Sequence, residues 1–168
     1  PMPLPIVAPP LLNAAQAEFL LGPVAINMAS RDKDGFPSIS RCHGCLVSPD
    51  RREVVVFVSR SRTDPLLRDL ANGAPVAVVF CRPLTHETLQ LKGERARLRQ
   101  LETDEWEHMR AAGRAFAAES LALGFPDYFS NLIMASSSTE ATAVVFTPIA
   151  VFEQTPGPKA GTRLEPRP

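Results

Sequence analysis

The sequence predicts a mainly β fold, a six-stranded antiparallel barrel with a few peripheral helices. Short apolar segments rich in β-branched residues recur along the chain, and turn signals separate them at close spacing. The predicted helices fall at the start, in the middle and late in the chain, so they do not alternate with strands as βαβ units require. The 168 residues suffice for one sizeable core. We expect an extended arm over 1–12, a barrel domain over 13–155 and a tail over 156–168.

The first half is expected to hold one helix and three strands. Asn13 can cap a helix over 14–21, because its side chain can accept backbone amide bonds, and Gly22 can end it. A hairpin turn at 32–35 ends in Gly35, which tolerates a positive φ, and the sequence Ser-Pro-Asp-Arg predicts a second turn. The strands alternate with these turns and are expected over 23–30, 37–47 and 53–59.

The clearest helix signal covers residues 63–73. Thr63 or Asp64 can cap this helix, Pro65 suits its first turn and Gly73 can end it. Alternation predicts a strand at 85–98 in which Gly93 forms a bulge. The remaining predicted elements are a strand over 75–81, helices over 102–123 and from 126 to about 135, and a last strand over 141–153.

Charge and hydropathy exclude several classes of partner. Lys and Arg together number 18, as do Asp and Glu, and no long basic run is present. We therefore expect no nucleic-acid partner. No apolar run is long enough to cross a bilayer and no signal peptide is apparent, so we expect no membrane association and a cytoplasmic location. Three cysteines fit a reducing compartment.

Cys42 and Cys45 have the CxxC spacing of a dithiol or of half a zinc site. Positions three apart on a strand point to opposite faces of the sheet. The sequence also lacks a second ligand pair at a useful spacing. We therefore expect no metal and two ordinary half-buried cysteines.

Arg41 is the first candidate for a binding residue. Alternation places Arg41, His43 and Cys45 on one face of the predicted strand. A guanidinium there is either a solvated surface charge or a fork for phosphate oxygens. The residue pattern leaves both interpretations open.

Two further segments carry polar side chains suited to a ligand. Residues 59–63, Ser-Arg-Ser-Arg-Thr, precede a helix start, where amides and the helix dipole favour phosphate; the alternative is a polar turn that only caps the helix. His86, Thr88 and Gln90 alternate along a predicted strand and either face water or line a cleft between subunits. In such a cleft His86 is a candidate catalytic residue, because imidazole exchanges protons near neutral pH.

In their order along the chain, these features resemble the pyridoxamine 5′-phosphate oxidase-like flavoproteins, a family of split β-barrels. The likeness runs from Phe19 to Leu98 and includes the Asp-Gly hairpin, the Arg41 strand and the Ser-Arg turn. Residues 85–93 and 152–158 also resemble an uncharacterised bacterial branch of this family.

The resemblance implies FMN held at the interface of a homodimer. In the family, residues at matching positions hold the FMN phosphate, lie along the flavin ring or reach it from the partner subunit. Those that would hold the phosphate are Arg41, Ser61, Arg62 and Thr63. Val58 and Ser59 would lie along the ring, and Thr88 and Gln90 would reach it from the partner subunit.

The sequence departs from the true oxidase at two points. Leu46 stands at or near the position of the oxidase's flavin-binding lysine. Residues 163–166 are only weakly similar to the oxidase's C-terminal substrate segment. Vitamin B6 oxidation is therefore not expected. Related proteins bind haem or a deazaflavin, so two classes stay open: a flavin-dependent oxidoreductase acting on a small molecule, and a non-catalytic flavin- or haem-binding protein for storage, sensing or detoxification.

Overall fold

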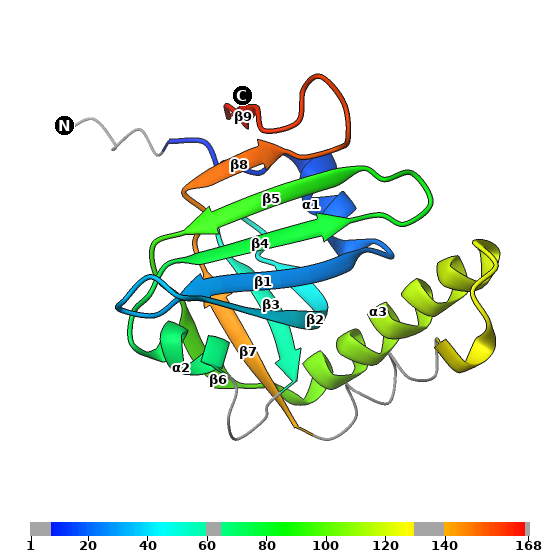
Figure 1. Ribbon diagram of the computed structural model, residues 1–168, viewed down its shortest axis with the longest axis horizontal. Coiled ribbons are helices and arrows are strands. Elements are labelled where there is room, and N and C mark those ends of the chain that lie inside the picture. The colour runs from blue at the N-terminus through cyan, green and yellow to red at the C-terminus, as the bar shows by residue number, and fades with distance from the viewer. Residues whose placement is uncertain (1–7, 60–64, 130–139, 167–168) are drawn as a thin grey trace, which may run out of the picture.

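A single antiparallel sheet dominates the computed structural model, which describes residues 8–59, 65–129 and 140–166 (Figure 1). Nine strands lie in the order β6-β7-β3-β2-β1-β4-β5-β8-β9, and the described edges β6 and β9 do not pair with each other. The strands are β1 (Ala25–Arg31), β2 (Pro37–Val47), β3 (Val54–Ser59), β4 (Val76–Cys81), β5 (Thr88–Gly93), β6 (Arg97–Gln100), β7 (Ala141–Phe146), β8 (Ala150–Glu153) and β9 (Arg163–Leu164). The helices are α1 (Ala14–Leu21), α2 (Pro65–Ala71) and α3 (Thr103–Ala122).

The prediction of a mainly antiparallel fold with a few helices is confirmed, but the prediction of six strands is wrong. The expected strand at 85–98 divides into β5 and β6, and Gly93 ends β5 instead of forming a bulge within it. The strand at 141–153 divides into β7 and β8 around Pro148, which lacks the amide proton that a continuous ladder needs. In the tail, expected to be loop, β9 pairs with β8.

The predicted helices α1 and α2 pack on the inner side of the curled sheet. Asn13 caps α1 as expected, in a reciprocal pair of hydrogen bonds with Gln16. Leu20 of α1 and Leu70 of α2 belong to the buried core that also contains Val56 of β3 and Val78 of β4. The segments 60–64 and 130–139 lie outside the described residues; they include the proposed α2 cap and most of the short helix expected from Pro126.

Helix α3 packs instead on the outer face of the sheet. Met109 of α3 joins a second buried cluster with Val55 and Phe57 of β3 and Val145 of β7. In Figure 1, α3 runs beside the sheet while β1, β4 and β5 face the viewer without a helix over them. The outer face is thus divided into a part that α3 covers and a part that no described helix covers.

A bulge in β2 allows α3 to approach closely. The pairing of β2 with β3 shifts between Cys42 and Cys45, and Gly44 between them has a φ of +115°. A Cβ atom on Gly44 would lie 2.9 Å from the Cβ of Ala112 in α3. Only glycine therefore suits both the backbone conformation and the space at this position.

Candidate functional site

The outer face of the sheet carries one cross-strand row that contains two of the predicted binding residues. Asn27 of β1 pairs with Arg41 of β2 on one side and with Val79 of β4 on the other. Val79 in turn pairs with Gln90 of β5. At about 4.8 Å per strand, Arg41 and Gln90 lie roughly 14 Å apart along this row.

Ser59 ends the neighbouring strand β3. Cys42 of β2 pairs with Val58, and Ser59, one residue further along β3, lies on the outer face because Val58 faces the core. Val58 itself is fully buried in the core and offers no surface to a ligand in this chain. The predicted residues Ser61, Arg62 and Thr63 come two to four positions after Ser59 in the sequence and lie outside the described residues.

Arg41 is held between the sheet and α3. Its guanidinium carbon lies 4.8 Å from the centre of the Phe116 ring of α3. Its Nε atom is buried and has no hydrogen-bond partner. Burial lowers the pKa of Arg41, but the group stays charged because an arginine titrates far above neutral pH. The structure thus presents a half-buried cation with an unused donor.

His43 lies two positions further along β2 and is half-buried on the same face. Burial lowers the pKa of His43, and the charge of Arg41 lowers it further. His43 is therefore neutral at physiological pH. Alternation correctly placed His43 beside Arg41, yet it gave no sign that α3 would cover this part of the strand.

Thr88 and Gln90 are confirmed as neighbours on the outer face of β5, but both already make contacts within the chain. The Thr88 hydroxyl donates to the His86 carbonyl oxygen at 2.8 Å, and the Thr88 amide donates to the Thr155 hydroxyl at 3.0 Å. The Gln90 side-chain oxygen accepts from Gln154 at 3.3 Å. Segment 154–155 therefore borders this end of the row.

The expectation that His86 shares the strand face of Thr88 and Gln90 is wrong. His86 is exposed in the turn between β4 and β5, before β5 begins, and has a φ of +58°. Its amide donates to the Arg82 carbonyl oxygen at 2.9 Å and closes that turn. The alternation rule failed because it assumes extended backbone, whereas the turn places His86 in the left-handed region.

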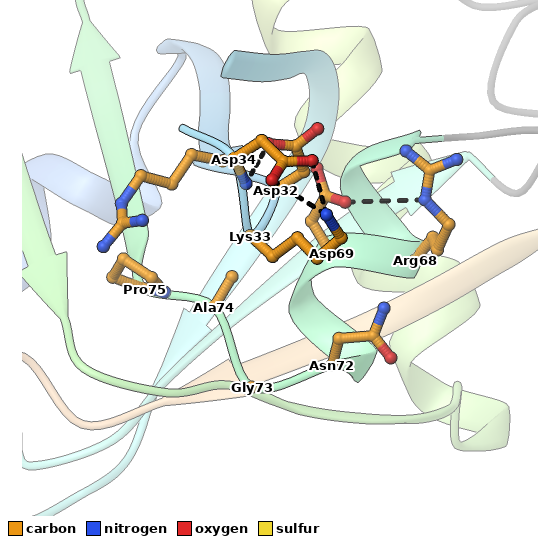
Figure 2. Close-up of a pocket in the computed structure, with 10 residues that line it drawn as sticks. Asp32, Lys33, Asp34, Arg68, Asp69, Asn72, Gly73, Ala74 and Pro75 are labelled. Atoms are coloured by element: carbon orange, nitrogen blue, oxygen red, sulfur yellow. Dashed lines mark hydrogen bonds and ion pairs between the residues drawn. The ribbon is translucent and has the colours of Figure 1, made fainter. Parts of the chain in front are cut away.

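A separate pocket of about 620 Å³ lies between the β1–β2 turn and the C-terminal end of α2 (Figure 2). None of the predicted site residues lines it, and its acidic side chains have internal roles. Asp32 accepts the amides of Asp34 and Phe36, both at 2.9 Å, which forms the hairpin turn. Asp69 accepts the Ser38 hydroxyl at 2.7 Å and so ties α2 to β2. We interpret this pocket as a consequence of turn and helix anchoring.

The two CxxC thiols both point into the core, because the bulge at Gly44 cancels the alternation between them. The prediction that Cys42 and Cys45 point to opposite faces is therefore wrong, as is the placement of Cys45 beside Arg41. Both cysteines are buried. Within the described ranges no group of three or more His, Cys, Asp or Glu side chains is arranged to hold a metal.

Cys81 should react with an alkylating reagent before Cys42 and Cys45 do. Cys81 is only half-buried, whereas burial raises the pKa of Cys45 to about 12, and the Cys45 thiol donates to the Leu20 carbonyl oxygen at 3.0 Å. Because the thiolate is the reactive form, Cys45 is protected at about pH 8. A short iodoacetamide pulse followed by peptide mass spectrometry gives the order of labelling, with the urea-unfolded chain as control. A first label on Cys42 or Cys45 would contradict this account.

Comparisons with known proteins support the fold. No protein-family model matches the sequence, and no curated protein does. A candidate pyridoxamine 5′-phosphate oxidase of Lactobacillus delbrueckii is 16% identical, with 84% of this chain and 93% of that chain covered and a TM-score of 0.51. HupZ of Group A Streptococcus is 14% identical, with 89% and 99% covered and a TM-score of 0.52.

These two proteins are similar to the chain over most of their length. At such low identities the likeness shows the fold alone, and it confirms the split-barrel prediction. The described helices include none long and apolar enough to span a bilayer.

Proposed function

From the split-barrel fold as premise, we propose that this chain binds FMN between two copies of itself and acts as an oxidoreductase on a small molecule. The flavin supplies electron-pair transfer chemistry, and the protein supplies binding, orientation and the exclusion of water. The single observation that carries the proposal is the outer-face row that joins Arg41 to Gln90. Two of the residues that the family resemblance implies, Arg41 and Gln90, lie in this row, on a surface that α3 leaves partly open.

The residues present fit the group chemically. Arg41 has a buried Nε donor without a partner, which suits an anionic oxygen. It lies at one end of the row, and Ser61, Arg62 and Thr63 are the other expected phosphate ligands. Gln90, and Thr88 beside it, are the expected contacts from the partner subunit to the ring. Arg41 would thus hold the phosphate, and Gln90 and Thr88 would contact the ring.

The uncovered outer face also has the composition of a surface between subunits. Along β1 and β4 it carries small or apolar side chains such as Ala29, Ala77 and Val79. Nearby, Phe36 and Ile39 have exposed fractions of 70% and 72%. Large apolar side chains this exposed are typical of a surface that a partner covers, and a C2 dimer would bury them with the row.

An absorbance spectrum and a solution mass of the purified protein test this proposal together. We expect flavin bands near those of free FMN and a light-scattering mass of two chains at micromolar concentration. Reduction by NAD(P)H with turnover of an acceptor would identify an enzyme, whereas binding without turnover would identify a storage or sensing protein. A Soret band, or a single-chain mass with no affinity for FMN, would overturn the proposal.

Replacing Arg62 with alanine should weaken FMN binding about ten- to a hundredfold. The expected loss is one charge-assisted fork to phosphate, worth about 1.5–3 kcal/mol. Quenching of FMN fluorescence on titration with apoprotein measures the dissociation constant. Arg114→Ala is the matched control, because Arg114 lies on α3 and pairs with the exposed Glu107. Equal affinity of the folded Arg62→Ala protein and the wild type would remove Arg62 from the site.

A further inference from the structure

Two buried polar atoms of opposite charge lack hydrogen-bond partners in the described part of the chain, and both lie where α3 meets the sheet. One is Nε of Arg41, and the other is Oε2 of Glu119. Glu119 follows Phe116 by three residues, so the two side chains are neighbours on one face of α3. Buried polar atoms normally have partners, so their coincidence here requires an explanation.

The contact between Arg41 and Phe116 uses the face of the guanidinium group. The Arg41 carbon lies over the Phe116 ring at 4.8 Å from its centre. The five N–H donors of a guanidinium lie in its plane, so stacking on a ring leaves them available to an anion. Phe116 thus restrains Arg41 without using its donors.

An ion pair lies close to Phe116 in the C-terminal half of α3. Arg82, directly after β4, donates from Nε to Glu119 Oε1 at 2.9 Å, and its terminal nitrogen lies 2.8 Å from the same oxygen. Glu119 is only 8% exposed, so this pair holds α3 to the sheet in a partly desolvated setting. The pair ties the C-terminal half of α3 to the end of β4 while Phe116 lies against Arg41 of β2.

We propose that Phe116 is a positioning residue for an anion site at Arg41, and that the Arg82–Glu119 pair holds α3 where Phe116 performs this role. The inference rests on the function proposed above, since the anion is taken to be the FMN phosphate. It adds a contribution from α3, which the sequence did not indicate. An Arg41 side chain that is already restrained loses less conformational entropy when the anion binds.

The experiment first examines the apoprotein, so that it does not depend on the cofactor. The Arg41 Nε–H resonance, assigned from its loss in Arg41→Gln, should show an upfield ring-current displacement in a ¹⁵N–¹H spectrum. Phe116→Leu, which keeps apolar bulk but removes the ring, should abolish the displacement, and Phe116→Tyr should preserve it. Thermal unfolding confirms that each variant is folded.

Titration with FMN then measures the consequence for binding. We expect Phe116→Leu to weaken FMN binding about three- to tenfold and Phe116→Tyr to stay within about twofold of wild type. Glu119→Gln should weaken it in the same direction, because the variant removes the charge that holds Arg82. Glu107→Gln, in an exposed pair on the same helix, is the matched control and should bind as wild type does.

The two proposals fail in different ways. If wild type does not bind FMN, the proposed function fails, while the Arg41 resonance still reports whether Phe116 positions the guanidinium. If wild type binds FMN but Phe116→Leu binds equally or more tightly, the positioning role is overturned. An undisplaced Arg41 resonance in wild type would overturn it as well. If Phe116→Leu does not fold, the FMN affinities of Glu119→Gln and Phe116→Tyr are compared with each other instead.

Discussion

Replacing Gly44 with alanine should lower the free energy of unfolding by about 2–4 kcal/mol in a urea titration. The added Cβ would have to tolerate a φ of +115° and would lie 2.9 Å from the Cβ of Ala112. A non-glycine residue in such a backbone conformation costs about 1–3 kcal/mol, and overpacking adds a similar amount. The bulge that aligns Cys42 and Cys45 and the approach of α3 depend on the same residue, so both should be disturbed.

Two further variants separate backbone strain from the steric clash. Gly35 has a φ of +90° with open space around its Cβ position, so Gly35→Ala should cost only the strain, about 1 kcal/mol. In the Gly44→Ala background, Ala112→Gly should recover part of the lost stability by removing the clashing methyl group. Equal losses for Gly44→Ala and Gly35→Ala, without recovery by Ala112→Gly, would show that α3 does not press on the bulge.

Replacing Glu105 with alanine should lower the free energy of unfolding by a similar amount, about 2–4 kcal/mol. Glu105 is 4% exposed and accepts two hydrogen bonds of 2.7 Å from Arg99, together with the Glu102 amide at 2.8 Å. Removing one partner leaves the half-buried Arg99 charge uncompensated and the start of α3 without its cap. Glu107→Ala breaks an exposed pair on the same helix and should cost less than about 1 kcal/mol.

The stabilising effect of Glu105 should depend on pH in a defined direction. The Arg99 hydrogen bonds hold the pKa of Glu105 below its ordinary range. A carboxylate whose pKa is lowered on folding stabilises the fold above its unfolded pKa and loses that effect as pH falls through its folded pKa. The difference between wild type and Glu105→Ala should thus be constant near neutral pH and shrink below about pH 4. A difference independent of pH down to about pH 2 would contradict this.

Most of the fold could be predicted because its signals are local. Asn13 and Gly22 bound α1 as expected, and β2 has its predicted limits. The number of strands could not be predicted, because apolar periodicity continues across the interruptions at Gly93 and Pro148. The interruption at Gly93 depends on a neighbouring strand, because a Cβ at Gly93 would lie 2.8 Å from the Phe146 ring.

The candidate site was less predictable, because side-chain direction depends on backbone irregularities. Alternation could place Arg41 with His43 on one face of a strand, and Thr88 with Gln90 on one face of another, but only the strand pairing shows that Arg41 and Gln90 share a face of the sheet. The bulge at Gly44 and the left-handed conformation of His86 each break alternation locally, and both errors lie at those residues. Phe116 and Glu119 gave no signal, because only the packing of α3 on the sheet brings them to Arg41.

The open ends of the sheet bear on how this chain avoids fibril-like aggregation. A free edge strand offers unpaired amides and carbonyls to any other chain, and short or charged edges discourage such pairing. Here the edge β9 has two residues, Arg163 and Leu164, and the edge β6 has four, two of them the arginines Arg97 and Arg99. Neither edge is a good template for further strands. The short, arginine-bearing edges therefore disfavour indefinite edge-to-edge growth.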